Sequence, residues 1–337
     1  MRKTALAAIA GLSTIALVAC SGSDGGSGDG SSSGGSAEAP DAVSIIVPAD
    51  PGGGWDQTGR ALAQTFTGDD IVGSAPVENI GGAGGANGLA ALANEKDPWT
   101  LMITGLVMVG AVETNASQVR IEDTTPIARL TEEPLVIVVP ADSEYQTLEQ
   151  LVTAIEDEGQ AVSITGGSAG GADHILAGLV LEAAGLSSEE IAANLNYVPN
   201  SGGGEAVSLI IGGQASVGIS GVGEFVQHIE SGDMRALAVS SEEPVEALPD
   251  VPTITDEGYD VVLTNWRGVL APGDVTDQER TELERLVAEA HESESWTTEL
   301  ETRGWTDAYL PGAEFDEFLT GNISEVTTTL KNIGLVE

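Results

Sequence analysis

Four glycine-rich runs each follow a short apolar segment typical of a β-strand, and each precedes a helix-type pattern. They lie at residues 52–54, 81–85, 166–171 and 202–204. Glycine lets the backbone approach a ligand closely and turn its N–H groups outward. A helix start adds unpaired N–H groups and the positive end of a helix dipole. These runs therefore predict the binding of an anion, such as a carboxylate, by main-chain donors without lysine or arginine.

The candidate contact residues are the glycines of these runs and the small or polar residues beside them. Tight turns that serve packing alone are the alternative interpretation. The first two runs and the later three segments are expected to face one ligand, with selectivity coming from the later segments. The expected contacts are Gly52, Gly53, Gly54, Gly82, Ala83, Gly84 and Gly85, and then Ser168, Ala169, Gly170, Asn200, Ser201 and Ser220.

Four further side chains have two interpretations each. Asp56 either caps its helix or meets a ligand amine or a water. Thr104, at a strand end, is a hydroxyl donor to a ligand or an ordinary strand residue. His174, in the first turn of a helix, is a structural hydrogen-bonding group or a ligand contact. Arg267 either clasps a second carboxylate in two parallel hydrogen bonds or pairs with one of the many acids.

Ser168 also fits a catalytic pattern. The run from Gly166 to Gly170 has the Gly-x-Ser-x-Gly form of a nucleophile elbow, between a strand and a helix. A cell-surface serine hydrolase would then need a downstream acid and histidine, for which Asp250 or Asp260 with His291 are the candidates. In the alternative, Ser168 and the N–H groups of Ala169 and Gly170 bind a carboxylate and the chain is not an enzyme.

Charge and spacing argue against other classes of site. The chain carries 12 basic and 53 acidic residues, a formal net charge of −41, so a basic patch for nucleic acid is not expected. No His/Cys cluster predicts a transition-metal site, and the acids lack the spacing of a calcium loop. The run at 82–88 lacks the Gly-Lys-Ser/Thr of a phosphate loop. The sequence therefore predicts neither metal nor cofactor.

The N-terminus resembles a bacterial lipoprotein signal. Arg2 and Lys3 precede an apolar stretch that is short for a membrane span, and Leu17-Val18-Ala19-Cys20 resembles a lipobox. Cys20 is the only cysteine, so no disulfide forms within the chain. We expect a signal peptide at 1–20, lipid on Cys20 and a flexible Ser/Gly-rich tether at 21–41. These features predict an extracytoplasmic protein anchored to the outer face of the cytoplasmic membrane.

Strand and helix patterns alternate through the rest of the chain, which implies mainly parallel sheets with helices on both faces. Ligands bind at the carboxyl ends of strands in such sheets, which is where the glycine runs lie. Strands are expected at 43–47, 74–78, 100–104, 135–139, 162–165, 195–198, 216–219, 236–239, 261–263 and 269–270. Three helices close the chain, the first beginning with a Thr276–Glu279 capping box. The glycine-rich segments are spread over 170 residues, which is consistent with two sheets that face one cleft.

The motifs resemble the tripartite tricarboxylate transporter receptors, also called Bug receptors, over residues 43–337. The resemblance is carried by Pro51-Gly52-Gly53-Gly54 with Asp56, by Glu78-Asn79 with Gly82-Ala83-Gly84-Gly85, and by later motifs in the family's order. Those later motifs are Gly167-Ser168-Ala169-Gly170 with His174, Val198-Pro199 with Gly202–Gly204, Gly212-Gly213-Gln214, Leu248-Pro249-Asp250-Val251-Pro252, and Trp266 with Gly268.

The resemblance implies an α/β, two-lobed type II periplasmic-binding-protein fold with the ligand cleft between the lobes. Residues 42–130 plus 265–337 would form lobe 1 and residues 131–264 lobe 2. It implies a monomeric receptor that passes a small, citrate-like di- or tricarboxylate to integral membrane permease subunits; a sensor of the same fold that signals to another protein is the alternative. Asn200-Ser201 and Arg267 depart from the family's usual residues at their positions.

Overall fold

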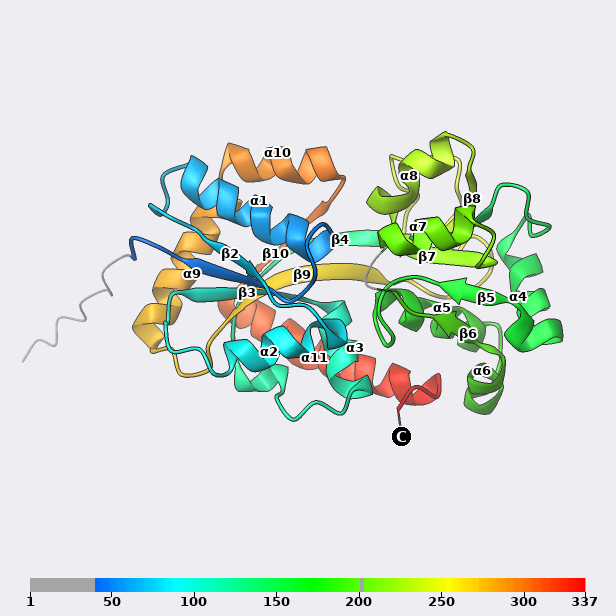
Figure 1. The fold of residues 1–337 in the computed structure, drawn as a ribbon, viewed down its shortest axis with the longest axis horizontal. Coiled ribbons are helices and arrows are strands. Elements are labelled where there is room, and N and C mark those ends of the chain that lie inside the picture. Colours follow the sequence, from blue (N-terminus) through cyan, green and yellow to red (C-terminus); the bar gives the residue numbers. More distant parts are fainter. Residues whose placement is uncertain (1–39, 201–202, 337) are drawn as a thin grey trace, which may run out of the picture. The chain divides into compact units, whose positions relative to one another are not determined.

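The computed structural model describes residues 40–200 and 203–336 (Figure 1). The predicted signal peptide, Cys20, all but the last two residues of the predicted tether, and Ser201 lie outside the described residues. None of the helices in the described part of the chain combines the length and the apolar character needed to cross a bilayer.

The strands lie where short apolar, β-branched segments occur, and one of them is much longer than the others. β4 is a strand of 16 residues. The strands are β1 (Ser44–Val47), β2 (Val77–Asn79), β3 (Thr100–Gly105), β4 (Thr125–Pro140), β5 (Ser163–Thr165), β6 (Asn196–Val198), β7 (Val217–Gly221), β8 (Met234–Val239), β9 (Thr264–Ala271) and β10 (Thr306–Pro311).

β4 passes through both lobes of the fold. Its residues 125–134 pair with β9, and part of this segment also pairs with β10. Its residues 135–140 pair with β7 and β8 instead. The resulting strand order is β2-β1-β3-β9-β4-β7-β5-β6, with β8 and β10 as additional partners of β4. We call the half of the sheet with β1, β2, β3, β9 and β10 lobe 1, and the half with β5 to β8 lobe 2.

The outer strands of each lobe are parallel. β1 pairs in parallel with β2 and β3, and β5 pairs in parallel with β6 and β7. The pairings of β4 and β9 are antiparallel, because these strands cross between the lobes. Parallel strands end at a common edge, so the loops after β1, β2 and β3 share one edge and those after β5, β6 and β7 share another.

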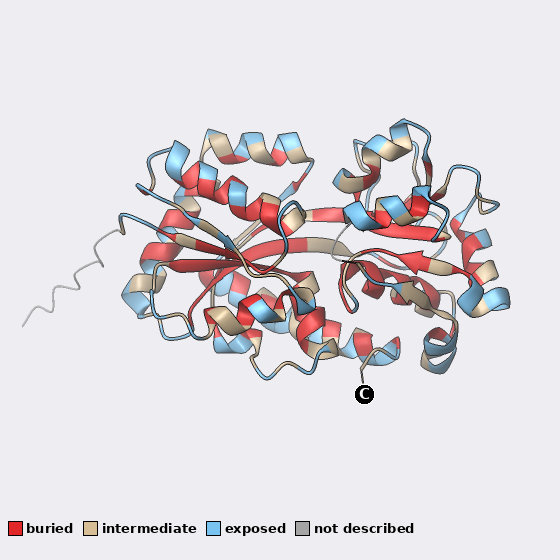
Figure 2. Ribbon diagram, viewed as in Figure 1, coloured by how far each residue is buried: buried red, intermediate tan, exposed pale blue. Residues whose placement is uncertain are grey.

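Helices cover the sheets with their apolar faces inward, and Figure 2 shows buried residues concentrated on the strands and on the inner sides of the helices. α9 shows the pattern, with Leu283, Leu286, Val287 and Ala290 buried. The helices are α1 (Gly54–Gly68), α2 (Ala86–Leu92), α3 (Leu106–Thr114), α4 (Leu148–Glu158), α5 (Ala172–Ala183), α6 (Ser188–Asn194), α7 (Gly203–Ile211), α8 (Val222–Glu230), α9 (Asp277–His291), α10 (Glu294–Arg303) and α11 (Gly312–Asn332).

The last helix connects the lobes. α11 packs against β4 in lobe 1 and also contacts α5 in lobe 2 (Figure 1). The contact with α5 includes Ile333, the residue directly after α11. A Cβ placed on Gly178 of α5 would lie 2.6 Å from Ile333 Cδ1. Glycine at 178 thus permits the close approach of the two helices.

Three features of the fold differ from the sequence-based expectations. Residues 261–263 are not a strand; the strand begins at Thr264. β4 begins ten residues earlier than expected, because its first part mixes polar, charged and apolar residues without regular alternation while the expected part is continuously apolar. The strand β10 and the short helices α3 and α6 were not predicted; α3 is apolar on nearly every side and so lacks a helical period.

Candidate functional site

Among the helices whose N-cap lies in the described part of the chain, five begin at a glycine that follows a strand or a glycine loop. Their N-cap residues are Gly53 for α1, Gly85 for α2, Gly105 for α3, Gly171 for α5 and Gly221 for α8. None of these glycines supplies a side-chain acceptor to the first turn. The first N–H groups of each helix therefore depend on water, on other loops or on a ligand for their acceptors. They lie at the carboxyl-end edges of the two parallel strand sets.

The two edges face each other across the boundary between the lobes. A Cβ on Gly84, in lobe 1, would lie 3.7 Å from Ser168 Cβ in lobe 2. A Cβ on Gly110, in α3, would meet the carbonyl oxygen of Gly170, and one on Gly171 would lie 3.3 Å from Val107 Cγ1. Because these contacts join the loops that the sequence singled out, the fold brings the lobe 1 and lobe 2 candidates into one region.

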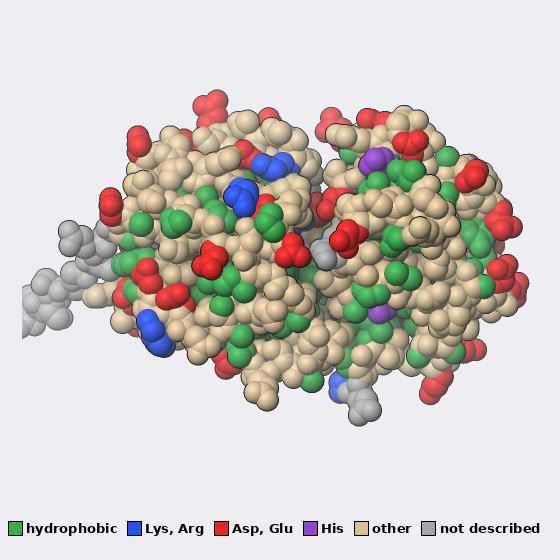
Figure 3. Space-filling model, viewed as in Figure 1, with side chains coloured by type: hydrophobic (Ala, Val, Ile, Leu, Met, Phe, Trp, Pro, Cys, Tyr) green, Lys and Arg blue, Asp and Glu red, His purple; other side chains and the backbone are tan. Residues whose placement is uncertain are grey.

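Figure 3 shows a groove between the two lobes on the face in view, with acidic side chains on both of its sides. A Cβ on Gly52, on Gly53 or on Gly204 in the first turn of α7 would meet nothing within 4 Å, so these positions border open space. A separate surface depression of about 400 Å³ lies at the amino ends of β5 and β7, lined by Asp142, Ser143, Tyr145 and Ser216 among others. We assign the site to the groove, since the glycine N-caps lie at the opposite ends of those strands.

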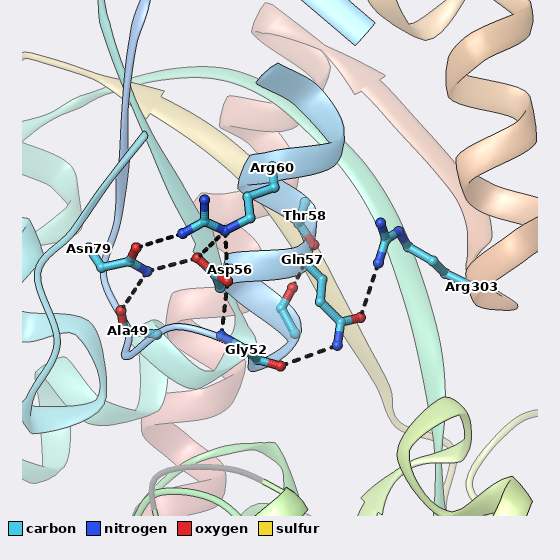
Figure 4. Close-up of polar contacts among 9 residues, drawn as sticks. Ala49, Gly52, Asp56, Gln57, Thr58, Arg60, Asn79 and Arg303 are labelled. Atoms are coloured by element: carbon cyan, nitrogen blue, oxygen red, sulfur yellow. Dashed lines mark hydrogen bonds and ion pairs between the residues drawn. The ribbon is translucent and has the colours of Figure 1, made fainter. Parts of the chain in front are cut away.

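Asp56 organises the first glycine loop (Figure 4). Its carboxylate accepts hydrogen bonds from the Gly52 N–H at 2.9 Å, from Arg60 Nε at 2.9 and 3.0 Å, and from Asn79 Nδ2 at 2.9 Å. Asn79 Nδ2 also donates to the Ala49 carbonyl, which ties β2 to the loop. Asp56 therefore caps the Gly52 N–H rather than the first turn of the helix.

The environment keeps Asp56 ionised. Burial by itself would raise the pKa of Asp56, but the hydrogen bonds from Arg60, Asn79 and the Gly52 N–H lower that pKa below its usual value. With both oxygens committed to these donors, Asp56 acts as a positioning residue for the loop.

The second glycine loop is held in a conformation that favours glycine. Gly82, Ala83, Gly84 and Gly85 all have positive φ, at 111°, 51°, 60° and 99°. The Gly85 N–H donates to the Gly82 carbonyl, and a Cβ on Gly85 would clash with Trp55 and Met108. The shape of this turn thus depends on packing against α1 and α3.

The lobe 2 loop is fixed by its own helix. His174 Nδ1 accepts the Gly170 N–H at 3.1 Å, and its ring stacks on Tyr197 with a centroid distance of 4.0 Å. Burial lowers the pKa of His174 to about 4, so the ring is neutral. The structure thus assigns His174 a positioning role, and the Gly170 N–H is occupied while Ser168 is partly exposed and Ala169 exposed.

Asn200 and Ser220 are likewise engaged with their neighbours. Asn200 Nδ2 donates to Thr165 Oγ1 at 2.6 Å and to the Gly166 carbonyl at 3.0 Å. The Ser220 hydroxyl donates to a Glu224 oxygen. Thr104 is fully buried, and its hydroxyl donates to Met108 Sδ at 3.5 Å. A ligand contact by any of these groups requires an exchange of the present bond.

Arg267 is buried and pairs across the strands. Its guanidinium binds Glu133 of β4, lies 5.2 Å from the centroid of the Trp305 ring, and contacts the first residue of α1, where a Cβ on Gly54 would meet Nη2. Only 4% of Arg267 is exposed, so the ion pair with an acid, one of the two interpretations from the sequence, is formed in the interior rather than at the surface.

The serine-hydrolase constellation is not assembled. Ser168 Oγ makes no hydrogen bond to another described residue. His291 instead lies 3.1 Å from both Asp307 carboxylate oxygens and stacks on Tyr309 at the surface of lobe 1. Among residues 40–200 and 203–336, no group of three His, Cys, Asp or Glu side chains converges as a metal site would require.

Sequence reasoning missed three acids that the fold places near the groove. They are Glu133 on β4, Asp173 in the first turn of α5 and Glu224 in the first turn of α8. Burial raises the pKa of Asp173 to about 7, the Gly167 N–H lowers it, and Glu224 and Glu133 add repulsion. The available signals were an acid in the first helical turn after a glycine, at Asp173 and Glu224, and the acids in the polar first part of β4.

A family model described as the tripartite tricarboxylate transporter family receptor matches residues 63–335. An Agrobacterium vitis UPF0065 protein, encoded in the TAR-I ttuE-ttuC' intergenic region, is 31% identical over 256 residues, which covers 74% of this chain and 70% of that protein.

Solved structures show the same fold. The periplasmic binding protein BugD has a TM-score of 0.77 and 21% identity, with 88% of this chain and 98% of that chain covered. MatC from Rhodopseudomonas palustris with bound malate has a TM-score of 0.73 and 20% identity, with 86% and 98% covered. The chain therefore has the two-lobed periplasmic-binding-protein fold.

Proposed function

We propose, because the chain belongs to the tripartite tricarboxylate transporter receptor family, that it captures a small di- or tricarboxylate outside the cytoplasm and delivers it to a membrane permease. The ligand would lie in the groove between the lobes, with one carboxylate on the first N–H groups of α1. The chain would be held at the outer face of the membrane by lipid on Cys20.

One observation carries the proposal. The helices that start at the facing edges of the two lobes begin at glycine N-caps, so their N–H groups and dipole ends are left for an external anion. The opposed loops at Gly84 and Ser168 show that both lobes contribute to the same region. MatC, a protein of the same fold, holds malate, which is a dicarboxylate.

Calorimetric titration of the purified protein with citrate, malate, succinate, glutamate and aromatic acids tests the proposal. We expect at least one small carboxylate to bind with a dissociation constant at or below the micromolar range. If a folded and monodisperse protein binds none of these acids detectably, the proposed function is contradicted.

A substitution of Gly53 locates the site. Gly53 has extended backbone angles and open space at its Cβ position, so Gly53→Leu is expected to leave the fold intact and to abolish binding by covering the start of α1. Gly68→Leu is the matched control, because Gly68 is exposed at the other end of the same helix with equally open space. Equal affinity in both variants would place the ligand elsewhere. Gly84 is unsuitable, since its Cβ would clash with Ala111.

Membrane attachment and delivery have separate tests. Cys20→Ala is expected to move the protein from the membrane fraction to the soluble fraction without changing ligand affinity. Cells that lack the chain are expected to lose uptake of the bound carboxylate, and normal uptake in such cells would contradict delivery to a permease.

A further inference from the structure

A buried carboxyl group lies directly behind the lobe 2 glycine loop. Asp173 is in the first turn of α5, only 8% of it is exposed, and its Oδ2 accepts the Gly167 N–H. A Cβ on Gly166 would lie 2.7 Å from the Asp173 Cβ, so the loop packs closely on this side chain. The next residue of the loop, Ser168, faces Gly84 of lobe 1. Asp173 therefore lies on the lobe 2 side of the groove, beside the loop expected to contact the ligand.

Two further acids lie near Asp173. Glu133 of β4 is buried, with 5% exposed, and a Cβ on Gly221 would lie 2.7 Å from its Oε1. Glu224, in the first turn of α8, accepts a hydrogen bond from the Ser220 hydroxyl. Both acids repel a negative charge on Asp173. Because β7 ends and α8 begins at Gly221, the end of this strand brings the three acids into one region.

The groups around Asp173 do not compensate its negative charge. Arg267 is paired with Glu133. The His174 ring is neutral, because burial lowers its pKa to about 4. Burial and the charge of Asp173 raise the pKa of the Tyr197 phenol, so the phenol stays protonated. Burial and repulsion together raise the pKa of Asp173 to about 7, although the Gly167 N–H opposes the change.

The other helices packed against α5 leave this balance unchanged. They are α3, α6 and α11. Glu113, the charged residue of α3, pairs with Arg120, and the charged residues of α6 and α11 are exposed to water. Exposed charges act weakly on a buried group, because water and salt screen them. The titration of Asp173 is therefore set mainly by its burial, by Glu133 and Glu224, and by the Gly167 N–H.

An anion that binds in the groove adds another negative charge beside these acids. A like charge within about 6 Å disfavours the ionised form of a carboxyl group. At pH 7 about half of the molecules carry a proton on Asp173, so the other half can still take one up. By thermodynamic linkage, a ligand that favours the protonated form of a group binds together with a proton.

We propose that the protein binds one proton at Asp173 together with its anionic ligand, and that it releases the two together. This inference rests on the proposed function, since it describes how the same groove accepts an anion beside three acids, whichever acid the ligand is. The proton comes from the solvent and turns the carboxylate into a neutral carboxyl group. Oδ1 carries it, because Oδ2 holds the Gly167 N–H. Affinity is therefore higher in a mildly acidic medium than in an alkaline one.

Calorimetric titration at pH 7 in two buffers measures the proton uptake. PIPES and imidazole differ in their enthalpy of ionisation, so the apparent binding enthalpies differ in proportion to the protons taken up. The probes are L-malate, succinate and L-glutamate, whose carboxylates are almost fully ionised at this pH. Citrate or an aromatic acid replaces them if it alone binds. We expect an uptake of about 0.4 proton per bound acid, and an affinity about fivefold lower at pH 8.5 than at pH 6.5.

Two variants assign the proton to Asp173. Asp173→Asn keeps the size of the side chain and an acceptor for Gly167 but takes up no proton, so we expect an uptake below about 0.1 and an affinity that does not change between pH 6.5 and 8.5. Glu224→Gln removes one repelling charge, so the fall in affinity is expected at lower pH and the uptake at pH 7 is expected to be smaller. Glu314→Gln is the control, expected to match the wild type, since Glu314 lies in the first turn of α11 and is exposed.

The outcomes separate this inference from the proposed function. Binding without proton uptake in the wild type, with equal affinity at pH 6.5 and 8.5, would overturn the inference and leave the receptor function standing. Unchanged uptake in Asp173→Asn would also overturn it, because the proton would then bind elsewhere. Thermal unfolding verifies each fold; if Asp173→Asn does not fold, Glu224→Gln carries the test, and wild-type behaviour of that variant overturns the inference. No binding by any acid of the carboxylate panel would contradict the receptor function itself.

Discussion

Helices that begin at glycine and helices that begin at serine or threonine occupy different parts of this molecule. α1, α5 and α8 begin at glycines on the facing edges of the lobes. α4, α6, α9 and α10 begin at Thr147, Ser187, Thr276 and Ser293, whose side chains accept a first-turn N–H. Figure 1 shows α9 at one end of the protein and α4 and α6 at the other.

We interpret the difference as one between helix starts that serve stability alone and helix starts that serve the proposed ligand. A Ser or Thr cap satisfies the first turn internally and stabilises the helix. A glycine start gives up that contribution and leaves donors for something else. First-turn acids differ in the same way: hydrogen bonds from Ser187 lower the pKa of Glu190 in α6, whereas burial raises the pKa of Asp173 in α5 to about 7.

The largest expected effect is the pH dependence that Asp173 imposes. Its folded-state pKa lies above its ordinary value of 3.8, so its contribution to stability is fully present below about pH 4 and is lost as the pH rises to about 7. The loss is on the order of 4 kcal/mol at most. Urea unfolding of the wild type and Asp173→Asn between pH 4 and 8 measures it.

The Asp173→Asn variant is expected to have a flatter stability profile over that range. If the stability of the wild type and of the variant depends on pH in the same way, repulsion among surface acids rather than Asp173 sets the pH dependence. Below pH 4.5 the lowered pKa of Glu190 predicts the opposite sign, since its stabilising hydrogen bonds are lost on protonation.

Removal of Asp56 is expected to have the next largest effect. Asp56→Ala leaves the Gly52 N–H, Arg60 and Asn79 without their shared acceptor, and we expect a loss of about 3 kcal/mol in the free energy of unfolding together with loss of ligand binding. The exposed first-turn acid Asp277 supplies the control, with Asp277→Ala expected to change stability by less than about 1 kcal/mol. If Asp56→Ala still binds the ligand, the bonds that Asp56 makes to the first glycine loop are not required for ligand recognition.

Thr276→Ala probes the other class of helix start. The Thr276 side chain accepts the Glu279 N–H and Glu279 in turn accepts from Thr276, so the variant is expected to lose about 1 kcal/mol of stability. Ligand affinity, measured by calorimetry, should not change. A loss of affinity would mean that helix starts far from the groove are coupled to binding.

Gly53→Ser is expected to have the smallest effect on stability, and it compares the two classes of helix start at one position. It converts a functional helix start into a capped one, because the extended backbone of Gly53 suits an N-cap and the space in front of it is open. Stability is expected to rise by a few tenths of a kcal/mol. Affinity should fall by about tenfold, since the serine oxygen competes with the ligand for the same N–H groups. Unchanged affinity would contradict the assignment of α1 to the ligand.

Particular residues show how far sequence reasoning reaches. The Thr276–Glu279 capping box was readable because it depends on two residues three positions apart. β4 was half missed, because its first part carries Arg129, Glu132 and Glu133 among apolar residues. For Arg267 the sequence left a ligand carboxylate and an acid partner open, because the partner that permits its burial lies 134 residues away in the chain.

The sequence by itself determined the order of strands and helices, the glycine starts and the family, because hydrophobic period, turn residues and motif spacing are local. Only the tertiary structure decided that Asp173, Glu133 and Glu224 lie near one another, that Arg267 is buried between strands, and that Asp56 serves Gly52. Such groupings depend on the register of β4 with β9 and β7, and that register is set by the packing of the whole sheet.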